Sequence, residues 1–587
     1  MLVTKRKYLC MIPAITLVCH LSAWLTIPGV GYEQRRQIAR KEVVAMSGSE
    51  GNAVERFVNE LDTVVFAFGA LLTLSVIAAF FINRDAVADG IELVHGEMLS
   101  YMSWALLVIV FLIVIFLLFL IVGPWGKIKL GDEDPEYSFL SFFAMLYSAG
   151  FAAGVVFWGP TEGLFYYDDP NPLFGVEGGT SEAIPLAVQQ TLFHWALPQL
   201  AVFTIMGIAI GYFAYNYDNV PLRVSSALTP ILGKENLDGP AAKVIDILAV
   251  FATIGGVATS LGFIGSQFVT GLDYQWGISF GDLGIIAIVT TMTILFTISM
   301  VLGVNKGIRR LSNFNMGLFV LLMLATFILG PTMFLLLLGS QAIGGMISNF
   351  VSMSLYTGAA EGGTGWVEAW TVFYWAWALS WSPFAGLFIA RISKGRTVRE
   401  VAFTGIVATS AATIPWFTFV GGTAVLFEHQ GTADFSGAFE VGPEVSGFIL
   451  FDAFPFGSVL MIAFMILVTT FFITSADSST LAVSMMTTGG QERPSTINRI
   501  FWGIVLGMTA AILMILGGGE GAGALQDAVV ITGAPFAIVC FLAMLSLIKN
   551  FSGTRGRVLL QEKTVLFGST SDTSGDEPSP AAEPGDD

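Results

Sequence analysis

The segment FYWAWALSWSPFAG, residues 373–386, carries tryptophans at a spacing that suits the binding of a cation. Trp377 and Trp381 are four residues apart and share one face of a helix, whereas Trp375 points elsewhere. A quaternary ammonium has no hydrogen-bond donor, and aromatic faces hold such a cation with about 2 kcal/mol or more once it is desolvated. The alternative is that these rings pack between helices or face lipid.

A second segment, TTFFITSADSSTLAVSMMTTGG at residues 469–490, places hydroxyl groups beside an apolar helix. Thr474 and Ser475 are adjacent in it, and Asp477 follows. Hydroxyl and carbonyl oxygens suit a hard cation such as sodium. Hydrogen bonding between helices is the alternative role for such side chains.

The composition places both segments in a membrane. Of the 587 residues, 54% are hydrophobic and 12% are charged, whereas roughly 25% are charged in an average soluble domain. Many windows reach the roughly eighteen apolar residues that a bilayer core requires. The sequence therefore predicts an all-α polytopic integral membrane protein, since helices satisfy every backbone polar group internally.

The composition also argues against several other classes of function. The net charge is -17, opposite in sign to that of a nucleic-acid-binding protein. The three cysteines, Cys10, Cys19 and Cys540, and the four histidines form no cluster with the spacing of a metal site. No nucleophile, base and metal come together in the sequence, so we predict neither an enzyme nor a resident cofactor.

Hydropathy and turn signals predict thirteen apolar segments. They are residues 8–28, 62–83, 101–123, 138–160, 187–215, 244–270, 281–302, 314–338, 367–391, 403–427, 451–481, 499–517 and 526–548. A shorter amphipathic segment, residues 342–358, is predicted to lie at the membrane interface.

Basic loops predict the orientation of these spans. Lys and Arg are concentrated in loops that all fall on one side of the predicted helices, which the positive-inside rule makes the cytoplasmic side. These loops are residues 126–131, 305–312, 391–400, 493–499 and 549–557. The C-terminus is therefore predicted to be cytoplasmic, with residues 551–587 as a disordered acidic tail rich in Ser and Pro.

The first apolar segment fits this pattern less well. Basic residues 35–42 fall inside, which places basic residues 5–7 outside. Either this helix crosses the membrane against the rule, or it does not span, or it is a signal peptide that is removed. We treat residues 1–61 as an N-terminal extension with an extra hydrophobic helix, ahead of a main domain at residues 62–550.

Small residues at membrane depth predict two interrupted helices. Residues 147–163 and 379–395 combine Gly, Ala, Ser and Pro, and each begins a group of five predicted helices. This is a weak internal repeat, and inverted repeats with broken first helices place their binding site at the breaks, near the bilayer midplane. The alternative is that small residues only allow close packing.

Three motifs in this order resemble the betaine/carnitine/choline transporter family. They are FHWALPQLAVF (193–203), FYWAWALSWSPFAGLFIARISKGRTVRE (373–400) and TSADSSTLAVSMMTTGG (474–490). The loops WGKIKLG and NKGIRRLS are also similar, and the resemblance covers about residues 62–550.

The resemblance implies 12 core transmembrane helices, with two inverted five-helix repeats at about residues 138–338 and 367–548. The first hydrophobic helix would be an addition to these twelve. Family members carry trimethylammonium zwitterions by alternating access, work as homotrimers in the cell membrane, and in most cases are coupled to sodium.

The resemblance also implies a substrate-binding box. Its aromatic positions match Trp377, Trp381, Trp195 and Phe203, and its glycine motif matches Gly150, Ala152 and Gly154, where three glycines are usual. Two further positions, which are tryptophans in the betaine carriers of the family, are Leu200 and Ala378 here. The box is therefore incomplete.

Two sodium sites are implied in the same way. One matches Ser148, Phe151 and Phe471 through carbonyls and Thr474 and Ser475 through hydroxyls. The other matches Thr253 and Phe384, but its second threonine is Val257 here. Residues 244–304 contain no Lys or Arg that would replace an ion. We predict sodium coupling, with one or two ions.

The leading hypothesis is thus import of glycine betaine or a related osmolyte. The incomplete box leaves open a non-quaternary solute, such as a sulfonate, ectoine or dimethylsulfoniopropionate, or a channel or sensor with the transporter fold. The acidic residues Glu162, Asp246 and Asp477 are candidates for a function, since ionisable residues inside a membrane are costly, but each lies near a predicted span end, and solvation by water is the alternative. The basic patch at residues 549–557 is short, so osmotic regulation is not predicted.

Overall fold

The computed structural model describes residues 51–150, 152–301, 305–360, 364–440, 442–491, 493–517, 523–553 and 557. These residues are mostly helical, and within them the only β pairing is an isolated antiparallel bridge between Lys129 and Thr397. The predictions for the first apolar segment and for the acidic tail after residue 557 lie outside the described residues.

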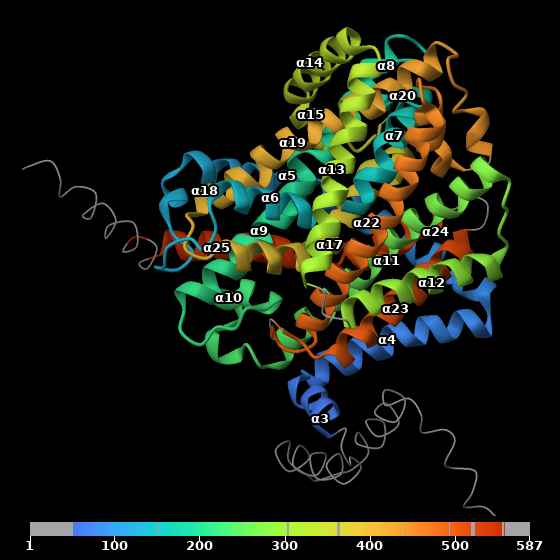
Figure 1. Ribbon diagram of the computed structural model, residues 1–587. Coiled ribbons are helices and arrows are strands. Elements are labelled where there is room, and N and C mark those ends of the chain that lie inside the picture. The colour runs from blue at the N-terminus through green and yellow to red at the C-terminus, as the bar shows by residue number, and fades with distance from the viewer. Residues whose placement is uncertain are drawn as a thin grey trace, which may run out of the picture.

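The helices follow the predicted order, with several spans built from consecutive helical pieces (Figure 1). The α-helices are α3 (Gly51–Glu60), α4 (Thr63–Ile82), α5 (Arg84–Val122), α6 (Phe139–Gly150), α7 (Ala152–Asp168), α8 (Ala183–Trp195), α9 (Leu197–Asn216), α10 (Thr229–Leu232), α11 (Pro240–Trp276), α12 (Asp282–Val301), α13 (Asn305–Leu329), α14 (Thr332–Ser348), α15 (Phe350–Leu355), α16 (Thr364–Val367), α17 (Phe373–Ile392), α18 (Val398–Ala402), α19 (Thr409–Trp416), α20 (Gly422–His429), α21 (Ser446–Asp452), α22 (Gly457–Met486), α23 (Thr496–Gly517), α24 (Gly523–Gly533) and α25 (Phe536–Ser552). Three π-helical turns, η5 (Glu368–Val372), η6 (Phe403–Ala408) and η7 (Phe417–Gly421), join α16 to α17, α18 to α19 and α19 to α20. Short 3-10 helices are η1 (Pro124–Lys127), η2 (Pro172–Phe174), η3 (Val224–Leu228), η4 (Lys234–Asn236), η8 (Gly437–Glu440) and η9 (Pro443–Val445).

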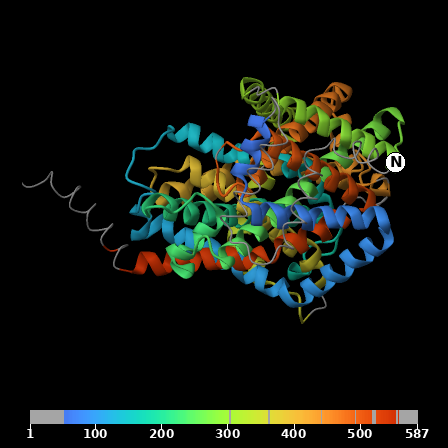
Figure 2. The ribbon, with the colours of Figure 1, turned by 90° about the horizontal axis from the view of Figure 1, so that it is seen from below.

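Within the described residues, eight helices are long and apolar enough to cross a membrane, or up to ten when each of two bent helix pairs counts as one span. This establishes a multi-pass helical membrane protein. The helices at the centre, α11 and α17, are buried along most of their length. Among the described spans, α4 lies at the edge of the molecule, and in Figure 2 the blue α4 and α5 meet at one side and diverge from there.

The span predicted for residues 314–338 is wrong at its C-terminal end. Helix α13 stops at Leu329, and α14 starts at Thr332 after a bend of 109°. Pro331 cannot continue the helix, and the Thr332 hydroxyl donates to the freed carbonyl of Phe327 at 2.6 Å. The helix predicted to lie at the interface over residues 342–358 therefore begins earlier, as α14.

Three of the five basic loops predicted to share one side, residues 126–131, 391–400 and 549–557, make contacts that place them on one face of the molecule. Lys129 lies in the loop after α5 and pairs with Thr397 in the loop before α18. Asn216, at the end of α9, donates to the carbonyl of Lys129 at 3.1 Å. Lys549, near the end of α25, donates to the carbonyl of Pro230 at 2.9 Å. The helix ends that carry these loops therefore point the same way.

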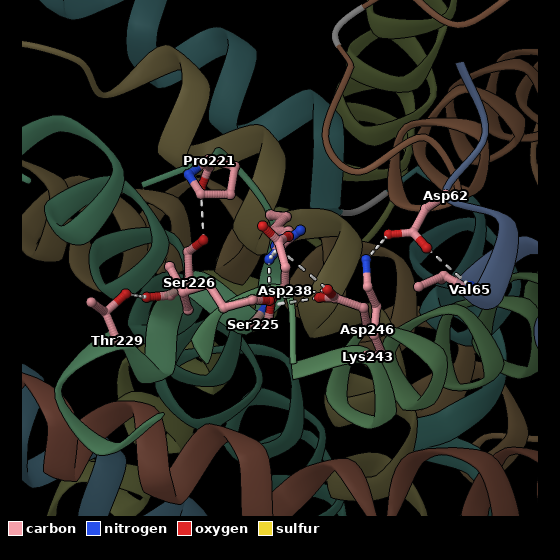
Figure 3. Close-up of polar contacts among 11 residues, drawn as sticks. Asp62, Val65, Pro221, Ser225, Ser226, Thr229, Asp238, Lys243 and Asp246 are labelled. Carbon is pink, nitrogen blue, oxygen red and sulfur yellow. Dashed lines mark hydrogen bonds and ion pairs between the residues drawn. The ribbon is translucent and has the colours of Figure 1, made fainter. Parts of the chain in front are cut away.

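An ionic cluster on this face ties the start of α4 to the start of α11 (Figure 3). The Lys243 ammonium on α11 binds the Asp62 carboxylate, which caps α4. The buried Asp246 carboxylate accepts hydrogen bonds from the Ser225 amide at 2.8 Å and from its hydroxyl at 2.9 Å. Arg223 lies 3.7 Å from the same carboxylate. The loop between α9 and α11 is thereby fixed to the bundle.

The interruption predicted within residues 379–395 is absent, because α17 runs unbroken through Pro383. A proline inside a helix leaves the carbonyl four residues before it without its usual donor. In α17 that carbonyl belongs to Leu379, and the Ser382 hydroxyl donates to it at 2.7 Å. A break is found instead between α8 and α9 at Ala196, directly after Trp195. In the other predicted break, residues 147–163, α6 ends at Gly150 and α7 runs from Ala152 unbroken through Pro160, while Phe151 between them lies outside the described residues.

Replacing Ser382 by alanine is expected to lower the thermal stability of the protein, because the Leu379 carbonyl then has no donor within the helix. An unsatisfied buried polar group costs about 1–3 kcal/mol. The apparent melting temperature in detergent, followed by size-exclusion chromatography, measures the effect. The double variant S382A/P383A should recover most of the loss, since an alanine in place of Pro383 restores the backbone amide donor.

The matched control is Ser340→Ala, which removes a hydroxyl bonded to a carbonyl on the exposed side of α14. Equal losses for S382A and S340A would contradict this account of how α17 tolerates its proline.

Candidate functional site

Two tryptophans of α17 face α11 and share one hydrogen-bond partner there. The Nε1–H of Trp377 donates to the Ser260 hydroxyl at 3.3 Å, and that of Trp381 donates to the same oxygen at 3.2 Å. Trp381 also donates to the carbonyl of Gly256 at 3.0 Å. The two indoles thus lie on one face of α17, as their spacing predicts. Trp375 points elsewhere and packs on Phe193 at 5.5 Å between ring centroids.

A third tryptophan meets this pair from α8. Trp195 lies edge-on to Trp377, with ring centroids 5.8 Å apart at 85°. Gly154 on α7 sits against both rings: a Cβ atom there would lie 2.5 Å from Cη2 of Trp377 and 2.8 Å from Cη2 of Trp195. Only a residue without a side chain fits at this position. The structure therefore brings Trp195, Trp377 and Gly154 together, with Trp381 one turn further along α17.

The remaining predicted box positions are buried or lie outside the described part. Phe203 is buried on α9, about two turns beyond Trp195. Leu200 and Ala378, the departures from the betaine carriers, are buried as well. The surroundings of Gly150 and of the Ala152 side chain lie outside what the structure describes.

One predicted sodium ligand on α22, Thr474, contacts an asparagine of α13. The Thr474 hydroxyl lies 3.2 Å from the carbonyl of Phe471 and accepts a hydrogen bond from Nδ2 of Asn315, on α13, at 3.2 Å. Among the described residues, neither the buried Ser475 hydroxyl nor Oδ1 of Asn315 has a hydrogen-bond partner. Unsatisfied buried oxygens are the groups that a bound cation would satisfy.

The second predicted sodium site has weaker support. The Thr253 hydroxyl lies 3.7 Å from the sulfur of Met486, which is a poor ligand for sodium. Val257, one turn along α11, is buried and offers no side-chain oxygen. Phe384 lies beside Trp381, with ring centroids 5.6 Å apart. Of the first site, Phe151 and the side chain of Ser148 lie outside the described residues.

The three acidic residues near predicted span ends are buried and paired, not solvated. Asp477 binds Arg499 at 3.0 Å, and Asp246 lies beside Arg223. Glu162 is fully buried and lies 2.9 Å from Nδ1 of His194. The alternative of solvation is wrong, because neighbouring helices cover these side chains, and the distance from a span end does not reveal such cover.

One buried acidic residue outside the spans, Glu444, has a shifted pKa. Burial raises the pKa of the Glu444 carboxyl on η9, where a hydrogen bond from Ser266 partly opposes the effect.

In the described part of the chain, no group of three or more His, Cys, Asp or Glu side chains forms a site for a metal such as zinc. The arrangement consists of aromatic rings and hydroxyls, which suits non-covalent binding.

The family description "BCCT, betaine/carnitine/choline family transporter" matches residues 64–555, which include every residue of this site. The chain belongs to this family. The glycine betaine transporter OpuD of Bacillus subtilis is 38% identical over 502 residues, covering 85% of this chain and 96% of the relative. An ectoine/hydroxyectoine transporter of Virgibacillus pantothenticus is 36% identical over 497 residues, covering 84% and 97%. Glycine betaine transporter 1 of Vibrio parahaemolyticus is 34% identical over 512 residues, covering 86% and 96%.

Membership of the BCCT family makes the protein a transporter and not an enzyme. The resemblance stated from the three motifs is thereby confirmed. Ser260 and Asn315 were missed from the sequence. Each lies in a helix that carries several other polar residues, and only its contact with a predicted site residue on another helix distinguishes it from them.

Gly154→Ala is expected to displace both the Trp377 and Trp195 rings, because the added Cβ overlaps them. A misplacement of binding groups by about 1 Å can lower rates by two orders of magnitude, so we expect at least a tenfold loss of glycine betaine uptake. Uptake into proteoliposomes measures this, with monodispersity as the check on folding. Gly344→Ala on α14 is the control, since a Cβ there meets nothing within 4 Å. Normal uptake by G154A would argue against a binding role for these rings.

Proposed function

We propose that this BCCT transporter imports glycine betaine or a closely related osmolyte by sodium-coupled alternating access. The observation that carries the proposal is the convergence of Trp195 and Trp377 from two different spans at Gly154, with Trp381 joined to Trp377 through the Ser260 hydroxyl. Two of the relatives named above are glycine betaine transporters, which supports the same substrate class.

The physical basis is the attraction of a quaternary ammonium to indole faces away from water. At a solvent-exposed site, hydration of the cation would weaken its attraction to the rings. Here each of the three tryptophans is less than a tenth exposed. A cation that offers no hydrogen-bond donor leaves no polar group unsatisfied when these rings enclose it.

A second substrate class is favoured by one observation. Leu200 and Ala378 take the place of box tryptophans, so the aromatic surface is smaller than in the betaine carriers of the family. Ectoine carries a delocalised charge that requires less aromatic enclosure, and one relative is an ectoine/hydroxyectoine transporter. Competition of unlabelled ectoine with labelled glycine betaine separates the two.

Sodium coupling is supported by the oxygens of α22. Thr474 and Ser475 offer hydroxyls on adjacent residues, and the unpartnered Ser475 oxygen and Asn315 amide oxygen suit an ion that favours hard ligands. We propose one sodium ion at this site. Alternating access would come from two inverted five-helix repeats, at about residues 138–338 and 367–548, moving against each other.

We also propose the location and assembly of the protein. The basic loops on one face suit the cytoplasmic side of the cell membrane, so the C-terminus would be cytoplasmic. The family resemblance supports a homotrimer, which light scattering of the purified protein would test.

Trp381→Ala is expected to abolish saturable uptake of labelled glycine betaine in proteoliposomes. The variant loses an aromatic face worth about 2 kcal/mol or more, which corresponds to at least a tenfold loss of affinity. Trp276→Ala, at an exposed tryptophan at the end of α11, should leave uptake unchanged. Betaine uptake that never saturates in the wild-type protein would favour a channel and overturn the proposal.

Replacing external sodium by potassium is expected to stop uptake. Ser475→Ala should raise the sodium concentration for half-maximal uptake by about tenfold, because one oxygen ligand is lost. Ser458→Ala, at an exposed serine at the start of the same helix, is the control. Equal uptake in sodium and in potassium would rule out sodium coupling.

A further inference from the structure

Glu162 is a fully buried carboxylate that receives hydrogen bonds from two helices. Tyr166, one turn along α7, donates its hydroxyl to Oε1 at 2.9 Å. His194 on α8 places Nδ1 2.9 Å from the same oxygen. The Nε1–H of Trp195 donates to the other oxygen, Oε2. Among the described residues, no Lys or Arg lies within ion-pair distance of this carboxylate.

The surrounding hydrogen bonds indicate where the protons lie. Asn171 donates its amide to Oε1 of Gln190 at 3.1 Å, so Nε2 of Gln190 points at Nε2 of His194, 3.0 Å away. An amide nitrogen only donates, so Nε2 of His194 accepts, and the imidazole carries its proton on Nδ1. That proton is directed at Glu162. The indole of Trp195 is also a donor only.

The donors therefore converge on Glu162 and leave it the acceptor. Acceptance from an indole N–H, an imidazole N–H and a phenol is the arrangement that stabilises a buried carboxylate in its charged form. Because ionisable residues inside a membrane are costly, such a network is expected to serve a function.

Trp195 connects this charge to the substrate-binding box. Its N–H is held by Glu162, while the far edge of its ring lies against Gly154 and against Trp377. One face of the Trp195 ring is stacked on the Phe417 ring, with ring centroids 4.9 Å apart and an interplanar angle of 28°. The carboxylate fixes the ring in its plane, and a negative group at the N–H shifts electron density onto the ring faces that attract a cation.

We propose that Glu162 is a positioning and specificity-determining residue of the transporter, which acts through the Trp195 indole to favour solutes with a positively charged head group. This inference rests on the proposed function. It accounts for how a box that lacks two tryptophans, at Leu200 and Ala378, would still select a cationic head: a charged partner strengthens one of the rings that remain.

The test compares glycine betaine with tert-butylacetate, which has the same shape but carries a neutral carbon where betaine has its ammonium nitrogen. Equilibrium binding of labelled glycine betaine to the purified transporter in sodium chloride gives its Kd, and competition gives that of tert-butylacetate. In Glu162→Gln, which keeps the size and an acceptor oxygen, the Kd of glycine betaine should rise at least about tenfold. The Kd of tert-butylacetate should change less than about threefold, since a neutral head gains nothing from the charge.

Two variants separate charge from structure. Glu162→Asp keeps the charge, so the ratio of the two Kd values should stay within about threefold of the wild-type ratio even if both ligands bind more weakly. This variant also tests the inference if E162Q does not fold. Glu444→Gln, at another buried acid outside the box, should leave both Kd values unchanged.

A Trp195→Phe background tests whether Glu162 acts through the Trp195 indole, because phenylalanine has no N–H group to bind the carboxylate. Glu162→Gln should then add less than about a threefold further change in the Kd of glycine betaine. A full effect in that background would show that the charge does not act through Trp195.

The outcomes distinguish this inference from the proposed function. If the wild-type protein binds no glycine betaine, the proposed function fails, and this inference with it. If the wild-type protein binds glycine betaine while E162Q weakens both ligands equally, or neither, this inference alone is overturned. Loss of the charge preference in E162D would overturn it too.

Discussion

The structure depends on hydrogen bonds that indole N–H groups make between different helices. An indole N–H inside a membrane has no water to bind, and its ring is too large to turn away from its neighbours. Trp195 of α8 binds Glu162 of α7, Trp381 of α17 binds the Gly256 carbonyl of α11, and Trp416 of α19 binds the Val155 carbonyl of α7 at 2.9 Å. These bonds link α8 and α19 to α7, and α17 to α11, at the centre of the bundle.

This constraint explains the small residues that surround the rings. Gly154 leaves room for Trp195 and Trp377, and Gly159 lies against the Trp416 ring. Gly256 exposes its carbonyl to Trp381, where a Cβ would lie 2.8 Å from the ring. Large aromatic rings and glycines are thus paired across helix contacts, which lets polar backbone groups reach the indoles. A surface built this way presents aromatic rings rather than charged side chains.

Charged groups are present, but they lie behind the aromatic surface or near the helix ends. Asp246 and Asp477 are paired with arginines, which supports the packing of loops and helix ends on the face with the basic loops. Glu162 differs, since its partners are neutral donors and one of them is a tryptophan of the box. Because a buried carboxylate is stable only when hydrogen bonds replace its hydration, the position of Trp195 and the charge of Glu162 depend on each other.

The sequence by itself determined the membrane class, most of the span positions, the shared face of Trp377 and Trp381, and the family. These follow from local properties: hydrophobic length, helical periodicity and the order of motifs along one chain. Only the tertiary structure decided that Ser260 joins the two tryptophans, that Asn315 meets Thr474, that Ser382 preserves α17 through its proline, and that Glu162 is buried behind Trp195. Local rules predicted neither the burial of the three acidic residues nor the continuity of α17. Burial depends on helices distant in sequence, and the Ser382 hydroxyl satisfies the carbonyl that Pro383 leaves free, a bond that residue types alone do not reveal.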